Sequence, residues 1–195
     1  MLFRLATPAD SAALLSVYAP YIDTPVTFEC QLPSVPEFTR RVTEILSFYP
    51  YLAVEQDGRI VGYAYAHRHH ERAAYQWDAE LSIYLDPAHT GRGVGRALYS
   101  ALMQLLQAQG LKNVYGKITV PNAQSEALHR SLGFACLGVY RQTGYKNGHW
   151  HDVALYEKRI APCTPAPAPP VALARVPAAK VQAILQAARQ APARA

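Results

Sequence analysis

The chain has 195 residues, half of them hydrophobic, and a net charge of +5. This length and apolar content are enough to bury one sizeable core, and nothing in the composition indicates a second. No run approaches the roughly 18 apolar residues of a membrane span, and the chain reaches Arg4 and Asp10 without the apolar region of a signal peptide. We therefore expect a cytoplasmic protein with no membrane contact.

The positive charge is concentrated in residues 161–195. This segment contains basic side chains and no Asp or Glu, which leaves residues 1–160 at about +1. A body so close to neutral disfavours a nucleic-acid binder. The basic residues of the segment are Arg175, Lys180, Arg189 and Arg194.

The same terminal segment is rich in Ala and Pro. Its first part, residues 161–170, has the composition of an extended, solvated linker. Residues 176–189 could instead form a short helix with a small apolar stripe. Because that stripe is small, we expect a folded domain over residues 1–160 and a mobile tail over residues 161–195. The stripe consists of Val181, Ile184, Leu185 and Ala188.

Local patterns predict the elements in chain order. Thr7 suits a helix N-cap, Pro8 the first helical position and Asp10 the third, so a helix begins there. A second helix begins near Pro36, and Gln-Asp-Gly at 56–58 favours a hairpin turn. Together with a first strand, the order of elements predicts an α/β (α+β) fold, a mixed sheet with helices on both faces. The other expected strands cover residues 51–55, 59–67, 80–85, 114–120, 134–140 and 152–159, and further helices follow Gly95 and Asn122.

A glycine-rich turn joins the strand at Glu80 to the helix that ends at Gly110. Leucines recur at helical spacing through this helix, so its positive dipole end points at the turn. Free N–H groups at a helix start can hold phosphate oxygens, and glycines let a ligand approach the backbone. Glycines before a helix are also ordinary turn residues, and that alternative stays open. The candidate cradle consists of Thr90, Gly91, Arg92, Gly93, Val94, Gly95 and Arg96.

Two familiar phosphate loops do not fit this turn. Arg96 stands where a dinucleotide-binding fingerprint needs its third glycine and where a P-loop needs its lysine. The turn instead resembles the Gln/Arg-x-x-Gly-x-Gly/Ala turn of the GNAT N-acetyltransferases, which binds the pyrophosphate of acetyl-CoA. Thr90 occupies the position where that family usually has Gln or Arg, which puts one side-chain contact in doubt.

A second segment, Pro121 to Phe134, resembles the Asn-x-x-Ser/Ala-x-x-x-Tyr/His-x-x-x-Gly-Phe segment of the same family. Read by itself, it is a short helix capped by Asn122 and followed by a strand. Further stretches across residues 1–160 resemble the phosphinothricin N-acetyltransferase subfamily, among them 27–29, 72–75, 80–84 and 144–152. The resemblance implies the GNAT fold and acetyl transfer from acetyl-CoA to the α-amino group of phosphinothricin, methionine sulfoximine or methionine sulfone.

The resemblance also implies roles for particular residues. An amine that attacks a thioester must lose a proton, and the departing thiolate benefits from gaining one. Glu80 stands where the subfamily places its probable base, although a solvated strand-end charge is the plainer reading. His129 stands where many relatives have the acid that protonates the thiolate, and a packing role is the equal alternative.

Ligand contacts follow from the same resemblance. Coenzyme contacts would come from the backbone of Ile83, Tyr84 and Leu85, from the cradle, and from Asn122 and Ser125. Arg72 suits a carboxylate or phosphinate because its guanidinium binds two oxygens at once. The residues expected around the substrate are Phe28, Arg72, Ala73, Ala74, Tyr75, Glu80, Leu81 and Ser82.

Metal and disulfide sites are not expected. His67, His69 and His70 lack partners at metal-ligand spacing and indicate a solvated strand end. Cys30, Cys136 and Cys163 are odd in number and suggest two core thiols and one tail thiol.

Relatives also imply a homodimer that meets through the C-terminal strands and the Trp150 region. Two other functions remain open from the sequence. One is acetylation of another small amine or a peptide N-terminus, and the other is a non-catalytic module that binds acyl-CoA.

Overall fold

The computed structural model describes residues 1–190, and the rest of the predicted tail, 191–195, lies outside the described residues. A seven-stranded sheet has the order β1-β2-β3-β4-β5-β7-β6. Neighbouring strands are antiparallel except β4 and β5, which are parallel. The predicted mixed sheet is therefore confirmed. Its strands are β1 (Leu2–Leu5), β2 (Tyr51–Gln56), β3 (Arg59–Arg68), β4 (Asp78–Leu85), β5 (Asn113–Val120), β6 (Ala135–Lys146) and β7 (His149–Arg159).

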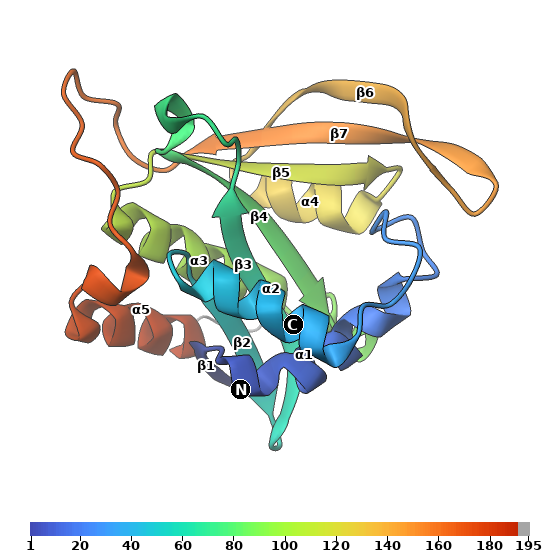
Figure 1. Ribbon diagram of the computed structural model, residues 1–195, viewed down its shortest axis with the longest axis horizontal. Coiled ribbons are helices and arrows are strands. Elements are labelled where there is room, and N and C mark those ends of the chain that lie inside the picture. The colour runs from blue at the N-terminus through green and yellow to red at the C-terminus, as the bar shows by residue number, and fades with distance from the viewer. Residues whose placement is uncertain (191–195) are drawn as a thin grey trace.

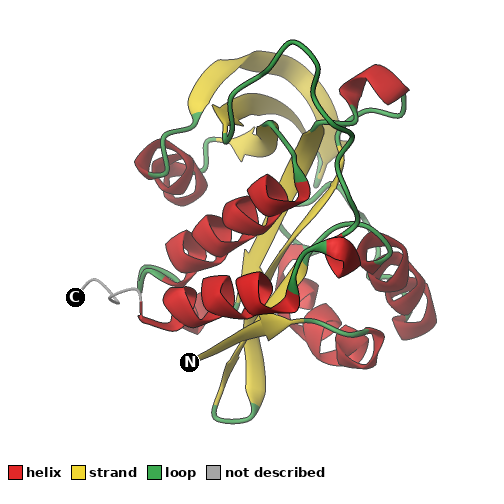
Figure 2. Ribbon diagram, turned by 90° about the vertical axis from the view of Figure 1, so that its left-hand side faces the viewer, coloured by secondary structure: helices red, strands yellow, loops and turns green. Residues whose placement is uncertain are grey.

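Helices cover both faces of the sheet (Figures 1 and 2). On one face, α1 (Ser11–Tyr18) and α2 (Val35–Leu46) pack over β2, β3 and β4. On the other face, α3 (Val94–Gln109) packs on the same strands, and α4 (Ala123–Ser131) packs beside β5. The leucines predicted on one side of α3 are all fully buried, which confirms the amphipathic pattern.

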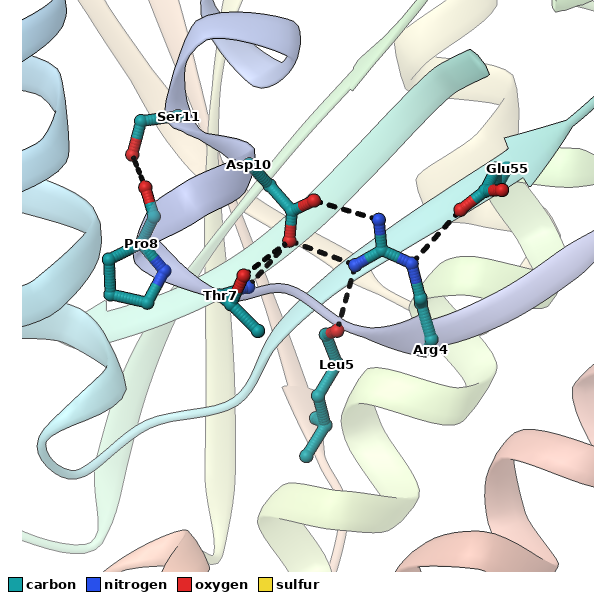
Figure 3. Close-up of polar contacts among 7 residues, drawn as sticks. All are labelled: Arg4, Leu5, Thr7, Pro8, Asp10, Ser11 and Glu55. Atoms are coloured by element: carbon teal, nitrogen blue, oxygen red, sulfur yellow. Dashed lines mark hydrogen bonds and ion pairs between the residues drawn. The ribbon is translucent and has the colours of Figure 1, made fainter. Parts of the chain in front are cut away.

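The N-terminus of the chain is fixed by an ion-pair network around Asp10 (Figure 3). Its carboxylate accepts bonds from the Thr7 backbone N–H at 2.7 Å and from both terminal nitrogens of Arg4 at 2.8 Å. Arg4 also bonds Glu55 on β2 at 3.1 Å. These contacts lower the pKa of Asp10 to about 2, with the Arg4 hydrogen bond as the main cause. The predicted helix start is therefore present, as a 3-10 turn at Pro8–Asp10 that leads into α1.

Two hairpins turn on residues with positive φ. Asp57 (φ 53°) and Gly58 (φ 75°) join β2 to β3, which confirms the predicted turn. Asn147 (φ 53°) and Gly148 (φ 79°) join β6 to β7 in the same way. Because of this second turn, β6 and β7 are longer than the sequence patterns indicated, and their far end projects from the body of the molecule (Figure 1).

The C-terminal segment differs from the expected mobile tail. It forms a helix, α5 (Ala178–Gln190), that packs against α3 and β1. All four residues of its apolar stripe are buried, and Leu173 and Val176 before the helix join the same core cluster. The stripe is small, but α3 and β1 give it an apolar surface to pack against, and this tertiary contact outweighs the linker-like composition.

The cysteines also differ from expectation. Cys30, Cys136 and Cys163 are all exposed, so Cys30 and Cys136 are not core thiols. Cys136 lies on β6, an edge strand whose residues are largely exposed, and Cys30 lies in the loop before α2. None of the helices in the described part of the chain has the length and apolar character needed to cross a bilayer.

Candidate functional site

The central feature of the site is a split in the sheet. β4 and β5 pair only from Asp78 with Asn113 to Glu80 with Tyr115, and then diverge. A cavity of about 80 Å³ opens between the diverging strands. Its lining comes mainly from β4, β5 and α4 with its N-cap, and includes Glu80, Ser82, Ile83, Lys117, Asn122, Ser125 and His129. The fold thus brings the predicted base and the predicted helix of the second motif to one cavity.

Glu80 reaches this cavity because of strand register. It pairs with His67 on β3 and with Tyr115 on β5, and paired residues on neighbouring strands point to the same face. Lys117 lies two residues beyond Tyr115 and therefore shares that face. The Glu80 side chain is only 13% exposed, so it is not the solvated strand-end charge of the plainer reading.

Three cationic or titratable groups surround the Glu80 carboxylate. Lys117 Nζ lies 2.8 Å from Oε2, His69 Nδ1 lies 3.6 Å from Oε2, and His67 Nε2 lies 4.0 Å from Oε1. The His69 ring stacks on Tyr115 with centroids 4.1 Å apart. Burial, followed by the neighbouring His70, lowers the pKa of His69, which favours its neutral form.

These neighbours were missed or misread at the level of sequence. Lys117 was not predicted as a site residue, and His69 is largely buried instead of lying at a solvated strand end. Alternation along β5 could have placed Lys117 on the face of Tyr115. Nothing local could have shown that this face meets Glu80.

The glycine-rich turn adopts a geometry suited to an anion. Gly91 (φ 73°) and Gly93 (φ 81°) are in the left-handed region, and α3 begins at Val94. The first α3 N–H that bonds back to the turn is that of Ala97, to Gly93 O at 3.0 Å. The preceding N–H groups have no intrahelical acceptor and are available to phosphate oxygens.

Two polar side chains of the cradle, those of Thr90 and Arg96, bond other parts of the protein and not the space in front of the α3 N-terminus. The Thr90 hydroxyl donates to Pro87 O at 2.9 Å, so it is directed back into its own turn. Arg96 Nη1 donates to the backbone oxygen of Ser131 at 2.9 Å and thereby ties α3 to α4. Arg92 is exposed. The backbone, and not these side chains, forms the preorganised part of the cradle.

The predicted coenzyme strand is only partly available. The Asp86 N–H donates to Val61 O on β3. The direction of the backbone N–H and C=O groups alternates from one strand residue to the next. The backbone groups of Tyr84 therefore face β3, and those of Ile83 and Leu85 face the split. Leu85 O accepts a bond from the Tyr21 hydroxyl at 2.5 Å. Ile83 is therefore the β4 residue best placed to bond a ligand in the split. Together with the cradle, this geometry fits an extended pantetheine arm and its diphosphate.

α4 contributes its N-terminus to the cavity. The Asn122 side chain caps the helix by accepting from Ser125 N at 3.1 Å, as predicted. The His129 ring is in the cavity wall but is only 2% exposed, and its Nδ1 lies 2.8 Å from Ser125 O. Because a carbonyl only accepts, Nδ1 carries the ring proton.

The state of His129 follows from these contacts. Its Nε2 is buried without a partner among the described residues, and burial lowers its pKa. The neutral ring therefore presents a lone pair at Nε2, not a proton. Edge contacts with Tyr99 and Phe134, at centroid distances of 5.4 and 4.9 Å, hold it in place. This arrangement favours the packing alternative over proton donation.

Most of the predicted substrate residues lie elsewhere. Leu81 and Ser82 line the cavity with Glu80. Arg72 and the 3-10 turn Ala73–Tyr75 are exposed and do not line it. They approach it indirectly, because Tyr75 packs on His70 and His70 packs on His69, at centroid distances of 4.7 and 4.0 Å. Phe28 packs on Gly144 of β6 instead.

A second cavity, of about 270 Å³, lies on the α1 and α2 face. Tyr84 lines both cavities, and His67 links the second to the Glu80 carboxylate. The lining includes five tyrosines and the Glu29–Arg41 ion pair, whose atoms lie 2.5 Å apart. Among residues 1–190 no group of three His, Cys, Asp or Glu side chains is arranged to hold a metal ion.

Comparison with known proteins places this geometry in context. Residues 3–155 match the family described as acetyltransferase (GNAT) domain. The chain is 36% identical to the phosphinothricin N-acetyltransferase of Streptomyces viridochromogenes over 86% of this chain and 93% of that protein. It is 30% identical to a methionine sulfoximine/methionine sulfone acetyltransferase of Salmonella typhimurium, over 82% and 95%.

A solved structure agrees with these sequences. The phosphinothricin acetyltransferase of Sinorhizobium meliloti, in complex with acetyl-CoA, superposes with a TM-score of 0.80 at 32% identity, covering 88% of this chain and 97% of that one.

Proposed function

Since the chain belongs to the GNAT acetyltransferase family and is an acetyl-CoA-dependent N-acetyltransferase, we propose that its acceptor is the α-amino group of a small amino-acid-like molecule. Phosphinothricin, methionine sulfoximine and methionine sulfone are the compounds that the names of its relatives suggest. The observation that carries the proposal is the position of the Glu80 carboxylate, which lies in the split between β4 and β5, on the strand that leads to the cradle of α3.

In this proposal each part of the site has a role. Acetyl-CoA supplies an activated acyl carbon. The N–H groups after Gly91 hold its diphosphate, and Ile83 on β4 bonds its extended arm. A backbone N–H of β4 stabilises negative charge on the carbonyl oxygen.

Proton transfer is assigned to Glu80 at the acceptor side. Its carboxylate accepts one proton of the ammonium, directly or through a water, so that the nitrogen lone pair can form the new C–N bond. As the C–S bond breaks, the second proton lost from that nitrogen passes to the departing sulfur, and coenzyme A leaves as the free thiol. His129 is given a packing role, because its neutral ring holds its proton on Nδ1, bonded to Ser125 O.

A thiol-release assay with Glu80→Gln tests this assignment. We expect the variant to bind acetyl-CoA like the unaltered protein, measured by calorimetry, and to release thiol about 10²–10⁴-fold more slowly with methionine sulfoximine. Glu71→Gln is the matched control, because the Glu71 side chain is 93% exposed. Full activity of Glu80→Gln would contradict the role of Glu80.

The acceptor panel should contain phosphinothricin, methionine sulfoximine, methionine sulfone, simple amines and short peptides. Faster turnover of the amines or peptides would favour another small-amine or N-terminal acetyltransferase. Acetyl-CoA binding without thiol release for any acceptor would contradict the proposed acceptor class and favour a binding module.

We also propose that two copies associate through the β6–β7 hairpin. Large apolar side chains are exposed on these strands, and Tyr145 and Trp150, each 60% exposed, pack against one another. Sedimentation analysis of Trp150→Ser should show a shift towards monomer. An unchanged sedimentation coefficient would contradict this contact.

A further inference from the structure

Lys117 supplies the counter-charge of the largely buried Glu80 carboxylate and is itself open to the cavity. Its side chain is 45% exposed, yet its ammonium lies over the split in the sheet, 2.8 Å from Glu80 Oε2. A lysine ammonium has three donors, and the bond to Glu80 uses one of them. Two donors remain, and Lys117 lines the same cavity as Glu80.

The Glu80–Lys117 pair presents a carboxylate and an ammonium side by side. An α-amino acid presents the same two charges in the opposite sense, with only the Cα atom between its nitrogen and its carboxyl carbon. An acceptor nitrogen at Glu80 therefore places its own carboxylate within reach of Lys117. Opposite charges matched in this way favour the zwitterion over a molecule that carries the amine alone.

Other basic residues are less suitable for this task. Arg72, the carboxylate partner expected from the sequence, is exposed and does not line the cavity. Arg96 is bonded to Ser131 on α4. Among the described residues that line this cavity, Lys117 is the one lysine or arginine side chain.

We propose that Lys117 recognises the α-carboxylate of the acceptor and so restricts the enzyme to free α-amino acids. This inference rests on the proposed function, because it requires the acceptor nitrogen to lie at Glu80. A site built to bind a charged group discriminates strongly against the analogue that lacks it, since its own polar group is then left unpaired.

The test compares methionine sulfone with its carboxamide, which keeps the amine and removes the carboxylate charge. We expect the unaltered enzyme to prefer the acid by at least about tenfold in kcat/KM. Lys117→Met should bring the ratio near one, mainly by raising KM for the acid, and Lys117→Arg should restore most of it. Any effect of the substitution on Glu80 itself is common to both acceptors and cancels in the ratio.

Lys180→Met is the matched control, because Lys180 is exposed on α5, away from the cavity. It should leave the ratio unchanged, and all variants should keep the KM for acetyl-CoA. An acid-to-amide ratio in Lys117→Met equal to that of the unaltered enzyme would overturn the inference while the proposed function stands. Acetyl-CoA binding without thiol release from either acceptor would overturn the proposed function and the role of Lys117 together.

Discussion

The Nε2 atom of His129 lies directly over Gly116, at the place where a β-carbon on residue 116 would come within 2.6 Å of it. Gly116 is on β5 and His129 is on α4, so this close approach sets how near the helix lies to the strand beside the cavity. The absence of a side chain at residue 116 is therefore a packing requirement of the site wall.

Gly116→Ala should displace the imidazole and destabilise the protein. Overpacking of this kind costs about 1–3 kcal/mol in the free energy of unfolding, which urea denaturation would measure. Gly138→Ala on β6 is the matched control, because a β-carbon there meets no atom within 4 Å. Equal stability of the two variants would contradict the proposed contact.

His129 should also make stability depend on pH. Its pKa is lowered in the folded protein because the ring is buried, whereas the unfolded chain has the ordinary value of about 6.5. Just below pH 6.5 the unfolded state therefore binds more protons than the folded state, so stability falls as the pH decreases through this value and rises as it increases. His129→Gln should lose this part of the slope between about pH 5 and 7. A constant difference in unfolding free energy between the two proteins across that range would count against a buried neutral ring.

The cradle can be tested with two glycines that share a backbone conformation. Gly93 (φ 81°) is the N-cap of α3, and Gly58 (φ 75°) lies in the β2–β3 turn. Alanine at either position should cost about 1–2 kcal/mol of stability, because a β-carbon is strained in the left-handed region.

Only Gly93→Ala should weaken acetyl-CoA binding. Loss of one bond to a charged phosphate corresponds to about 1.5–3 kcal/mol, or roughly tenfold or more in Kd by calorimetry. If Gly58→Ala weakened binding equally, the effect would reflect general destabilisation instead of the cradle.

The packing of α5 has a direct consequence for stability. Leu185 is 3% exposed in the core shared with α3, so Leu185→Ala should lower the free energy of unfolding by about 2–5 kcal/mol. Gln182→Ala, on the exposed side of the same helix, should change it little. Denaturation curves that coincide for Leu185→Ala and the unaltered protein would support the mobile tail expected from composition.

The sequence by itself determined the local elements and the family. Leucines at helical spacing, the Asp-Gly turn and the Asn122 cap act over a few residues, and each formed as its pattern predicted. The glycine-rich turn and the segment ending at Phe134 were enough to indicate the GNAT family, because each motif lies within one strand-to-helix or helix-to-strand unit.

Only the tertiary structure decided what surrounds the reacting groups. Lys117 and His69 meet Glu80 because three strands pair in one register and two of them then part, and no local pattern encodes that register. The burial of His129 against Gly116 and the docking of α5 on α3 likewise depend on surfaces supplied by distant segments. Composition predicted a mobile tail because residues 161–195 have few large apolar side chains. In the folded protein those of the α5 stripe are buried because α3 and β1 form a surface against which they pack.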